Sequence, residues 1–335
     1  MRRIPALAAI LGSTLLAGHV MADVTIYSGQ HESGTKIVAD AFTEATGIKT
    51  VIRKGSSEQF AGQLTEEGER TPADVFWSEQ IPPILALSDQ GLLAELSDET
   101  IAATSGEGFE SVPTAPDKNW VATSGRARVV VYDPAKIEEA ELADSVLDYA
   151  TPEWEGRIGF VPTSGAFLEQ IITITKMEGE DAARDWLTGL KEHGTQYAKN
   201  TVALEAVERG EIPAALINNY YWYNMVRERG GEDKVNSRLH FIGHQDPGAL
   251  VSYAAIAVLE GSDNKDEARQ FVDFVVSQEG QQVFADQKAE YPLRTDVTSG
   301  FDMLPYSELG APKVEPTTFE DRENAIRLLE ETGLK

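Results

Sequence analysis

Short apolar runs rich in β-branched and aromatic residues alternate with segments of helical periodicity along most of the chain. The runs predict strands, and residues spaced three and four apart between them predict helices. Gly47 and the pair Gly230-Gly231 stand where two of these helices should end. Strands are expected at 24–27, 50–52, 73–77, 129–132, 158–161, 214–217 and 250–259, and helices at 37–45, 60–67, 167–177, 181–191, 202–209, 221–229, 265–277, 281–287 and 319–334.

This order of elements predicts an α/β fold built around largely parallel sheets. The chain has 335 residues, 41% of them hydrophobic, which is enough for two domains with separate cores. The segment Ser124-Gly125-Arg126 precedes a strong strand and is a place for the chain to cross between domains. The long apolar run at 250–259 could carry it back.

The N-terminus has the form of a secretory signal peptide. Met1-Arg2-Arg3 precedes an apolar stretch over 4–17, and a small-residue cleavage site ends at Ala22. The stretch is too short to span a membrane as a permanent helix. We expect residues 1–22 to be removed, leaving an exported protein without stable membrane insertion.

The net charge argues against some classes of partner, and the cysteine content excludes some kinds of site. The formal net charge is −26, and the loss of Arg2 and Arg3 with the signal peptide takes it to −28. Such a charge argues against nucleic acid and anionic membranes as partners, and a solvated acidic surface explains it without a cation site. The chain has no cysteine, so disulfides, a lipid-anchoring cysteine and thiolate metal sites are excluded.

The run Asn218-Asn219-Tyr220-Tyr221-Trp222 places two adjacent phenols at the exit of a predicted strand. A phenol ionises only near pH ~10, but a highly charged cation at bonding distance favours the anion. Oxygen donors of this kind suit ferric iron better than zinc or copper(I). Aromatic pairs after a strand also occur as ordinary core residues, so the run alone leaves both interpretations open.

Five polar segments follow strands or begin helices, where ligands bind in open α/β sheets. Each also has an ordinary structural explanation. Ser164 or Thr163 and Asn200 are good helix N-caps, Glu79 could be an acid at a helix start, and a loop histidine such as His31 is often solvated. Together they predict one shared cleft, formed by His31-Glu32, Glu79-Gln80, Ser164-Gly165-Ala166, Asn200 and Asn218–Tyr221.

Longer motifs that contain these polar segments are distributed over the whole mature chain. They include Tyr27-Ser28-Gly29-Gln30-His31, Val75-Phe76-Trp77-Ser78-Glu79-Gln80, Pro162-Thr163-Ser164-Gly165-Ala166, Ile217-Asn218-Asn219-Tyr220-Tyr221-Trp222 and Ala289-Glu290-Tyr291-Pro292-Leu293. In these motifs the chain resembles the bacterial periplasmic ferric-ion-binding proteins. These are receptors of iron ABC importers with the type II periplasmic binding-protein fold.

The resemblance implies a set of site residues. The metal ligands would be His31, Glu79, Tyr220 and Tyr221. A synergistic anion, phosphate or carbonate, would complete the coordination of Fe(III) and would bind Ser164, Gly165, Ala166, Asn200 and Asn218. Gln80 would lie beside the ligands, while Tyr223 and Trp222 are expected to pack.

The same resemblance implies two domains with the cleft between them, each a mostly parallel sheet flanked by helices. The N-terminal domain would comprise 23–125 and about 250–295, and the C-terminal domain 126–249 and about 296–335. The expected function is a monomeric, non-enzymatic periplasmic receptor that delivers ferric iron to an inner-membrane ABC permease. The alternatives are a receptor of this fold for an anion or phosphorylated small molecule, without metal, and a secreted metal-dependent hydrolase with Glu79 as general base.

Overall fold

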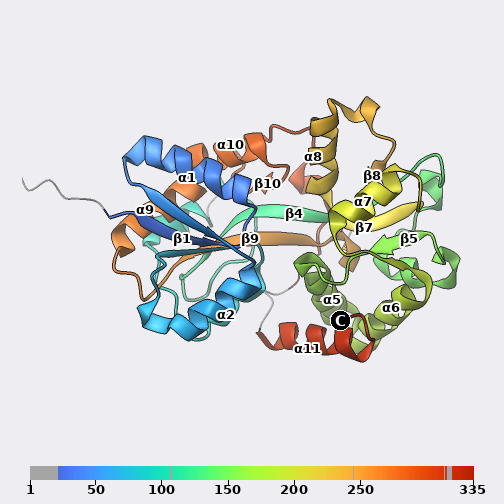
Figure 1. The fold of residues 1–335 in the computed structure, drawn as a ribbon, viewed down its shortest axis with the longest axis horizontal. Helices are drawn as coiled ribbons and strands as arrows, with labels where there is room; N and C mark the ends of the chain where they lie inside the picture. The colour runs from blue at the N-terminus through green and yellow to red at the C-terminus, as the bar shows by residue number, and fades with distance from the viewer. Residues whose placement is uncertain (1–21, 106–107, 244, 313, 315–318) are drawn as a thin grey trace, which may run out of the picture.

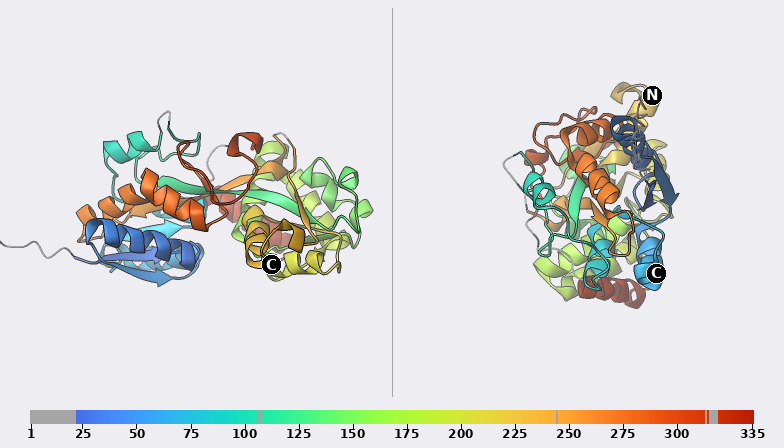
Figure 2. Two further views of the ribbon diagram at one scale, coloured as in Figure 1. Left: turned by 90° about the horizontal axis from the view of Figure 1, so that it is seen from above. Right: turned by 90° about the vertical axis from the view of Figure 1, so that its left-hand side faces the viewer.

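Two lobes lie side by side along the long axis of the molecule, joined by two long strands (Figures 1 and 2). The computed structural model describes residues 22–105, 108–243, 245–312, 314 and 319–335. The predicted signal peptide falls almost entirely outside the described residues. Among the helices within them, none is both long and apolar enough to cross a bilayer.

Within the described ranges, ten strands form one twisted sheet that runs through both lobes. They are β1 (Val24–Ser28), β2 (Thr50–Lys54), β3 (Val75–Ser78), β4 (Val121–Tyr132), β5 (Ile158–Phe160), β6 (Thr195–Gln196), β7 (Ala214–Asn218), β8 (Arg238–His240), β9 (Val251–Val258) and β10 (Tyr291–Pro292). Their main order is β2-β1-β3-β9-β4-β7-β5-β6, with β8 and β10 also paired to β4.

The strand directions are mixed rather than largely parallel. The outer pairs β1–β2, β1–β3, β5–β6 and β5–β7 are parallel, but β9 and β4 run antiparallel to their neighbours. The directions are mixed because two strands, β4 and β9, cross between the lobes. One half of β4 pairs with β9 in the first lobe and the other half with β7 in the second, so β4 and β9 carry the chain between the lobes in opposite directions. The α/β class is confirmed.

Helices cover both faces of the sheet in each lobe. They are α1 (Glu32–Thr46), α2 (Ser57–Glu67), α3 (Ile81–Ser88), α4 (Asp98–Ala103), α5 (Gly165–Glu178), α6 (Glu180–His193), α7 (Asn200–Glu208), α8 (Asn219–Arg229), α9 (Lys265–Val276), α10 (Gln278–Gln287) and α11 (Phe319–Glu331). As expected, Gly47 ends α1 in a left-handed conformation with φ 78°, and Gly230 ends α8 with φ 87°.

Strand alternation builds two cores in the first lobe. Val75 and Trp77 of β3 face α1, α9 and α10, while Phe76 between them faces α2 and α3. In β9, Ile256 likewise belongs to the core with α1, α9 and α10, and Ala257 to the core with α2 and α3. Because successive strand residues point to opposite faces, the nearly continuous apolar runs of these strands fit a sheet covered on both sides.

The second lobe repeats this arrangement. Val130 of β4 and Leu216 of β7 pack with α5, α6 and α11, whereas Val131 and Ile217 pack with α7 and α8. The C-terminal helix α11 therefore belongs to the core of the second lobe, and it lies along the lower edge in Figure 1. We propose that these lobes are the two domains, with the boundaries expected from the sequence.

Polar contacts outside the crossing strands also join the lobes. The Nε of Arg322 in α11 lies 3.3 Å from Glu58 Oε1 in α2. On another part of the interface, Arg227 in α8 donates to the carbonyl oxygen of Asp286 at 2.9 Å. That carbonyl belongs to the last turn of α10, where helical carbonyls lack partners within the helix. The two lobes are thus held against each other at more than one point.

Candidate metal centre

Two arginines of β4 point to the same side of the sheet at the junction of the lobes. Arg126 pairs in register with Ser252 of β9, and Arg128 with Asn218 of β7. Their side chains are 1% and 3% exposed. Guanidinium groups buried to this extent need anionic or strongly polar partners, because the loss of hydration is otherwise very costly. The residues that contact these two arginines form part of the candidate site.

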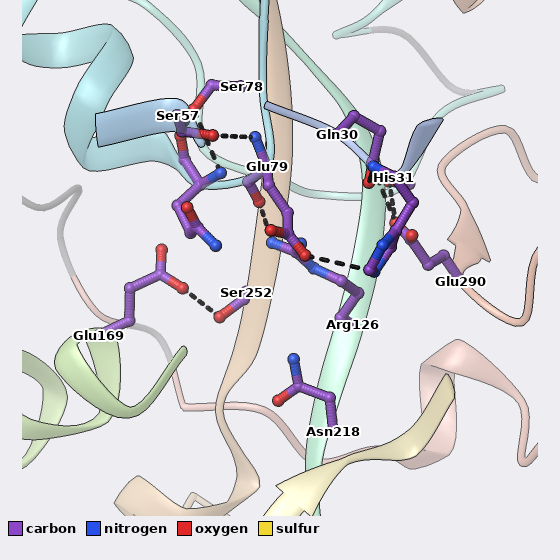
Figure 3. A network of polar contacts seen from close by, with 12 residues as sticks. Gln30, His31, Ser57, Ser78, Glu79, Arg126, Glu169, Asn218, Ser252 and Glu290 are labelled. Atoms are coloured by element: carbon purple, nitrogen blue, oxygen red, sulfur yellow. Dashed lines mark hydrogen bonds and ion pairs between the residues drawn. The ribbon is translucent and has the colours of Figure 1, made fainter. Parts of the chain in front are cut away.

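Arg126 holds Glu79, the first residue after β3. The Arg126 Nη1 lies 2.9 Å from Glu79 Oε1, and Nη2 donates a hydrogen bond to the main-chain carbonyl oxygen of Glu79. The amide of Glu79 donates to Ser57 Oγ at 2.8 Å. Figure 3 shows the carboxylate of Glu79 between Arg126 and His31. The residue is therefore fixed on three sides, with 23% of its side chain exposed.

His31 meets Glu79 from the loop between β1 and α1. Its Nε2 lies 3.5 Å from Glu79 Oε1, and it has no hydrogen-bond partner among the described residues. The amide of His31 donates to Gln30 Oε1 at 2.8 Å, and Gln30 Nε2 donates to Glu290 Oε2 at 3.3 Å. These two hydrogen bonds fix the loop. The imidazole nitrogen that faces Glu79 remains available to bind a metal.

The two adjacent phenols lie in the first turn of α8, opposite His31. The Tyr220 ring stands edge-on to the imidazole with centroids 5.1 Å apart, and its centroid lies 4.1 Å from that of Tyr221. The helix begins two residues earlier than the sequence predicts, with Asn218 as N-cap. The phenols therefore lie at the positive end of the helix dipole, which favours an anion.

Burial keeps both phenols neutral in the absence of a cation. Desolvation raises the pKa of Tyr220 well above its ordinary value, and the negative charge of Glu79 raises it further. Desolvation also raises the pKa of Tyr221. A cation that ionises these phenols has to displace two protons near neutral pH.

The residues expected to bind an anion lie around this cluster, but several already have protein partners. Ser164 is the N-cap of α5, and its side chain accepts from the amide of Phe167 at 3.2 Å. Asn218 Oδ1 accepts from Arg128 Nη1 at 3.0 Å. Gln80 lies across the cleft against Gly165, where an added Cβ would stand 2.7 Å from Gln80 Nε2. An anion here would have to displace the Gln80 side chain.

Ala166 and Asn200 lie at the starts of two helices, α5 and α7. Ala166 is buried in the first turn of α5. Asn200 is not an N-cap, which corrects the simpler of its two interpretations. α7 begins at Asn200 itself with Lys199 as N-cap, and the buried Asn200 Oδ1 lacks a hydrogen-bond partner in the described chain. Glu79 is not a helix-capping acid either, since α3 starts at Ile81 after Gln80.

No group of three or more His, Cys, Asp and Glu side chains is placed to hold a metal ion within the part of the chain that the structure describes. A metal centre at this position must therefore draw on the phenols. His31 of the first lobe contacts both Glu79 and Tyr220, which come from different lobes, and the ring of Tyr221 packs against that of Tyr220. Their oxygen-rich donor set fits a hard trivalent cation.

Comparisons with known proteins identify the family of the chain. Residues 71–313 match the model of a family described as bacterial extracellular solute-binding proteins. The chain is 54% identical to the major ferric iron-binding protein of Neisseria meningitidis serogroup B over 98% of each chain. The chain belongs to this family of solute-binding proteins.

Other relatives in the family support the resemblance to its ferric-ion-binding members. The Fe(3+)-binding periplasmic protein of Serratia marcescens is 32% identical over 93% of this chain and 90% of its own length. The crystal structure of iron-bound HitA from Pseudomonas aeruginosa superposes with a TM-score of 0.86 at 45% identity, covering 93% of this chain and 99% of that one. The predicted family and fold are confirmed.

Within this solute-binding protein, the sequence did not reveal the buried charges around the ligand candidates. Glu169 accepts a hydrogen bond from Ser252 Oγ, and burial raises its pKa to about 7. Glu290 is 1% exposed and accepts from Ser124 Oγ at 2.6 Å. The available signal was Arg126-Ala127-Arg128 inside an apolar strand, since two charges on one strand face predict buried acidic partners.

Replacing Arg126 by glutamine is expected to destabilise the metal-free protein by about 2–3 kcal/mol. Glu79 would then lack its cation, and the cost stays below the ~3–5 kcal/mol of a fully buried broken pair because Glu79 is partly exposed. Urea unfolding in the presence of a chelator measures the change. Arg157→Gln, which breaks an exposed pair with Glu141, is the control and should cost under ~1 kcal/mol. Equal costs for the two variants would contradict the structural role of Arg126.

Proposed function

We propose that this protein is a periplasmic receptor that captures ferric iron together with a synergistic anion and delivers it to an inner-membrane ABC permease. The observation that carries the proposal is the meeting of His31 and Glu79 from the first lobe with Tyr220 and Tyr221 from the second. A cation bound to all four would join the lobes. Closure of the lobes would then depend on the cargo.

The charge balance of the four donors favours a trivalent cation. Two phenolates and the Glu79 carboxylate supply three negative charges, and the free Nε2 of His31 supplies a neutral nitrogen donor. A divalent ion would leave one negative charge of these four donors without compensation from the metal, which is unfavourable in a buried site. Reduction of Fe(III) to Fe(II) should accordingly weaken binding.

Arg126 gives the metal-free site a cation of its own. Its guanidinium neutralises Glu79, and the carboxylates of Glu290 and Glu169 also favour its charged form. Arriving iron would compete with Arg126 for Glu79 Oε1. The receptor would therefore exchange one cation for another at Glu79, so the carboxylate is not left unpaired at any stage.

The anion would fill the remaining coordination positions of the iron, with phosphate or carbonate as candidates. Ser164, Gly165 and Ala166 provide the start of α5, and Asn200 provides a buried amide whose Oδ1 has no partner among the described residues. Asn218 would share the anion with Arg128, which is buried and carries a positive charge even with its pKa lowered by desolvation to about 10. Gln80 would move off Gly165 as the anion enters.

We propose no catalytic role for these residues, and a monomer is sufficient for capture because both lobes belong to one chain. Export would follow from the predicted signal peptide. Delivery would occur when the permease recognises the two lobes in their iron-bound arrangement.

The visible spectrum tests the iron assignment. Ferric iron added with phosphate or carbonate to metal-stripped protein is expected to give a coloured tyrosinate-to-iron charge-transfer band. Iron without either anion should give a weaker and less stable band. If the spectrum does not change, and the metal-free protein instead binds phosphate or a phosphorylated compound on its own, the receptor is one for anions.

A further inference from the structure

A large pocket opens beside the phenols and is lined by three of the four proposed iron ligands, His31, Tyr220 and Tyr221. Its volume is about 620 Å³, which lies in the range of pockets that hold small organic ligands rather than single ions. One wall comes from the start of α1 and the segment after α10, and the other from α7 and α8. The residues most relevant here are His31, Ser33, Lys36, Tyr220, Tyr221 and Lys288.

Most of the carboxylates that line this pocket are already neutralised or hydrogen-bonded. Glu32 pairs with Lys54 at 2.8 Å, and Glu205 pairs with Arg229 at 3.3 Å. Glu290 is turned inward to Gln30 and Ser124. Glu228 lies on the exposed last turn of α8, away from the start of that helix where the phenols lie. The acidic residues of the wall therefore do not exclude an anion near the phenols.

Lys288 differs from the other basic residues of the pocket. Lys36 pairs with Asp40 at 2.5 Å and Arg229 with Glu208 at 2.6 Å, but Lys288 has no carboxylate partner among the described residues. Its Nζ donates to Ser33 Oγ, and its stem packs on Gly34, where an added Cβ would lie 3.3 Å from Lys288 Cε. This lysine is half-buried, and desolvation lowers its pKa.

The charge of Glu290 attracts this ammonium group without forming an ion pair with it, but the position is otherwise unfavourable for a cation. Ser33 and Gly34 belong to the first turn of α1, whose positive dipole end repels a cation. The chain has 55 acidic residues against 29 basic ones, so a partner for a lysine would be easy to provide. An anion in the pocket would compensate both the desolvation and the helix dipole.

We propose that Lys288, together with Ser33, forms a second anion subsite that binds a carboxylate or phosphate group of a chelator still attached to the iron. The substrate class would then be ferric complexes of small polyanionic chelators as well as iron with a single inorganic anion. This inference rests on the proposed function, since Tyr220 and Tyr221 would hold the iron while the chelator extends into the pocket. It adds a group that recognises the chelator from the wall formed by α1 and the segment after α10.

The test compares two iron donors on the full mature protein. Iron is supplied to metal-stripped protein either as ferric citrate or with inorganic phosphate, and the affinity is measured by competition with a coloured chelator. In Lys288→Gln, the ratio of citrate-supported to phosphate-supported affinity should fall about tenfold or more, because one charge-assisted hydrogen bond is lost. Lys288→Arg keeps the charge and should restore most of the ratio.

Lys36→Gln is the matched control, because it removes a lysine of the same pocket that is exposed and already paired. Its ratio should remain within twofold of the wild-type value. An unchanged ratio in Lys288→Gln, or an equal fall in Lys36→Gln, would overturn the subsite. A wild-type protein that shows no iron band with either donor would instead refute the proposed function.

Discussion

Tyr220→Phe combined with Tyr221→Phe is expected to abolish the visible iron band and to lower the affinity for ferric iron by roughly 10⁴-fold or more. Each substitution removes an anionic oxygen donor. Even a hydrogen bond to a charged group contributes up to ~3 kcal/mol, and two such losses already correspond to about four orders of magnitude. The effect should be seen both in the spectrum and in competition titrations.

The control for this double variant is Tyr223→Phe. Tyr223 lies in the same helix and is 9% exposed, but its ring packs edge-on against Trp222 with centroids 5.1 Å apart. It should therefore keep the band and the affinity. A band of full intensity in the double variant would remove the basis for iron coordination at α8.

Iron affinity is expected to fall by up to about 100-fold for each unit that the pH is lowered across the neutral range. Burial raises the pKa of both phenols, so both carry protons in the metal-free protein at neutral pH. Binding releases two protons, and mass action then weakens binding as the proton concentration rises. The affinity should accordingly increase with pH until the phenols ionise without iron.

Titrations with chelator-buffered iron between pH 6 and 8 check this dependence once the proton equilibria of the competing chelator are taken into account. Direct measurement of the protons released per iron provides a second readout. The Tyr221→Phe variant should release one proton fewer than the wild type. A pH-independent affinity in the wild type would mean that the phenols do not ionise on binding.

Much of the fold could be predicted because its signals are local. The strands β1 and β7 and the ends of α1 and α8 follow from apolar runs and from the two terminating glycines. The helix α3 was considered only as an alternative explanation of Glu79, and its extent was not predicted, because five of its eight residues are buried and it lacks the polar face that makes helical periodicity visible. The first half of β4 was predicted only as a crossing near 123–127, because Gly125 and Arg126 interrupt its apolar pattern, and the pairing with β9 defines its extent.

Some residues of the candidate site could likewise be named from the sequence, and others only from the structure. His31, Glu79, Tyr220 and Tyr221 could be named from their positions after strands and from the resemblance to a known family, and their role as ligands stays a proposal. Arg126 was recognised only as a crossing point, because its partner Glu79 is 47 residues away in the chain. Lys288 gave no signal at all, since only the packing of α10 beside α1 shows that it lacks a carboxylate partner.

The sequence by itself determined which elements form, which donor types are available and how acidic the protein is. These properties depend on side-chain chemistry and on periodicities of a few residues. The tertiary structure alone decided that β4 and β9 pair antiparallel to each other, that Arg126 neutralises Glu79, and that the phenols lie buried at the start of α8. The reason is physical: desolvation and Coulomb energies depend on distances in space, and the groups involved come from segments far apart in the chain.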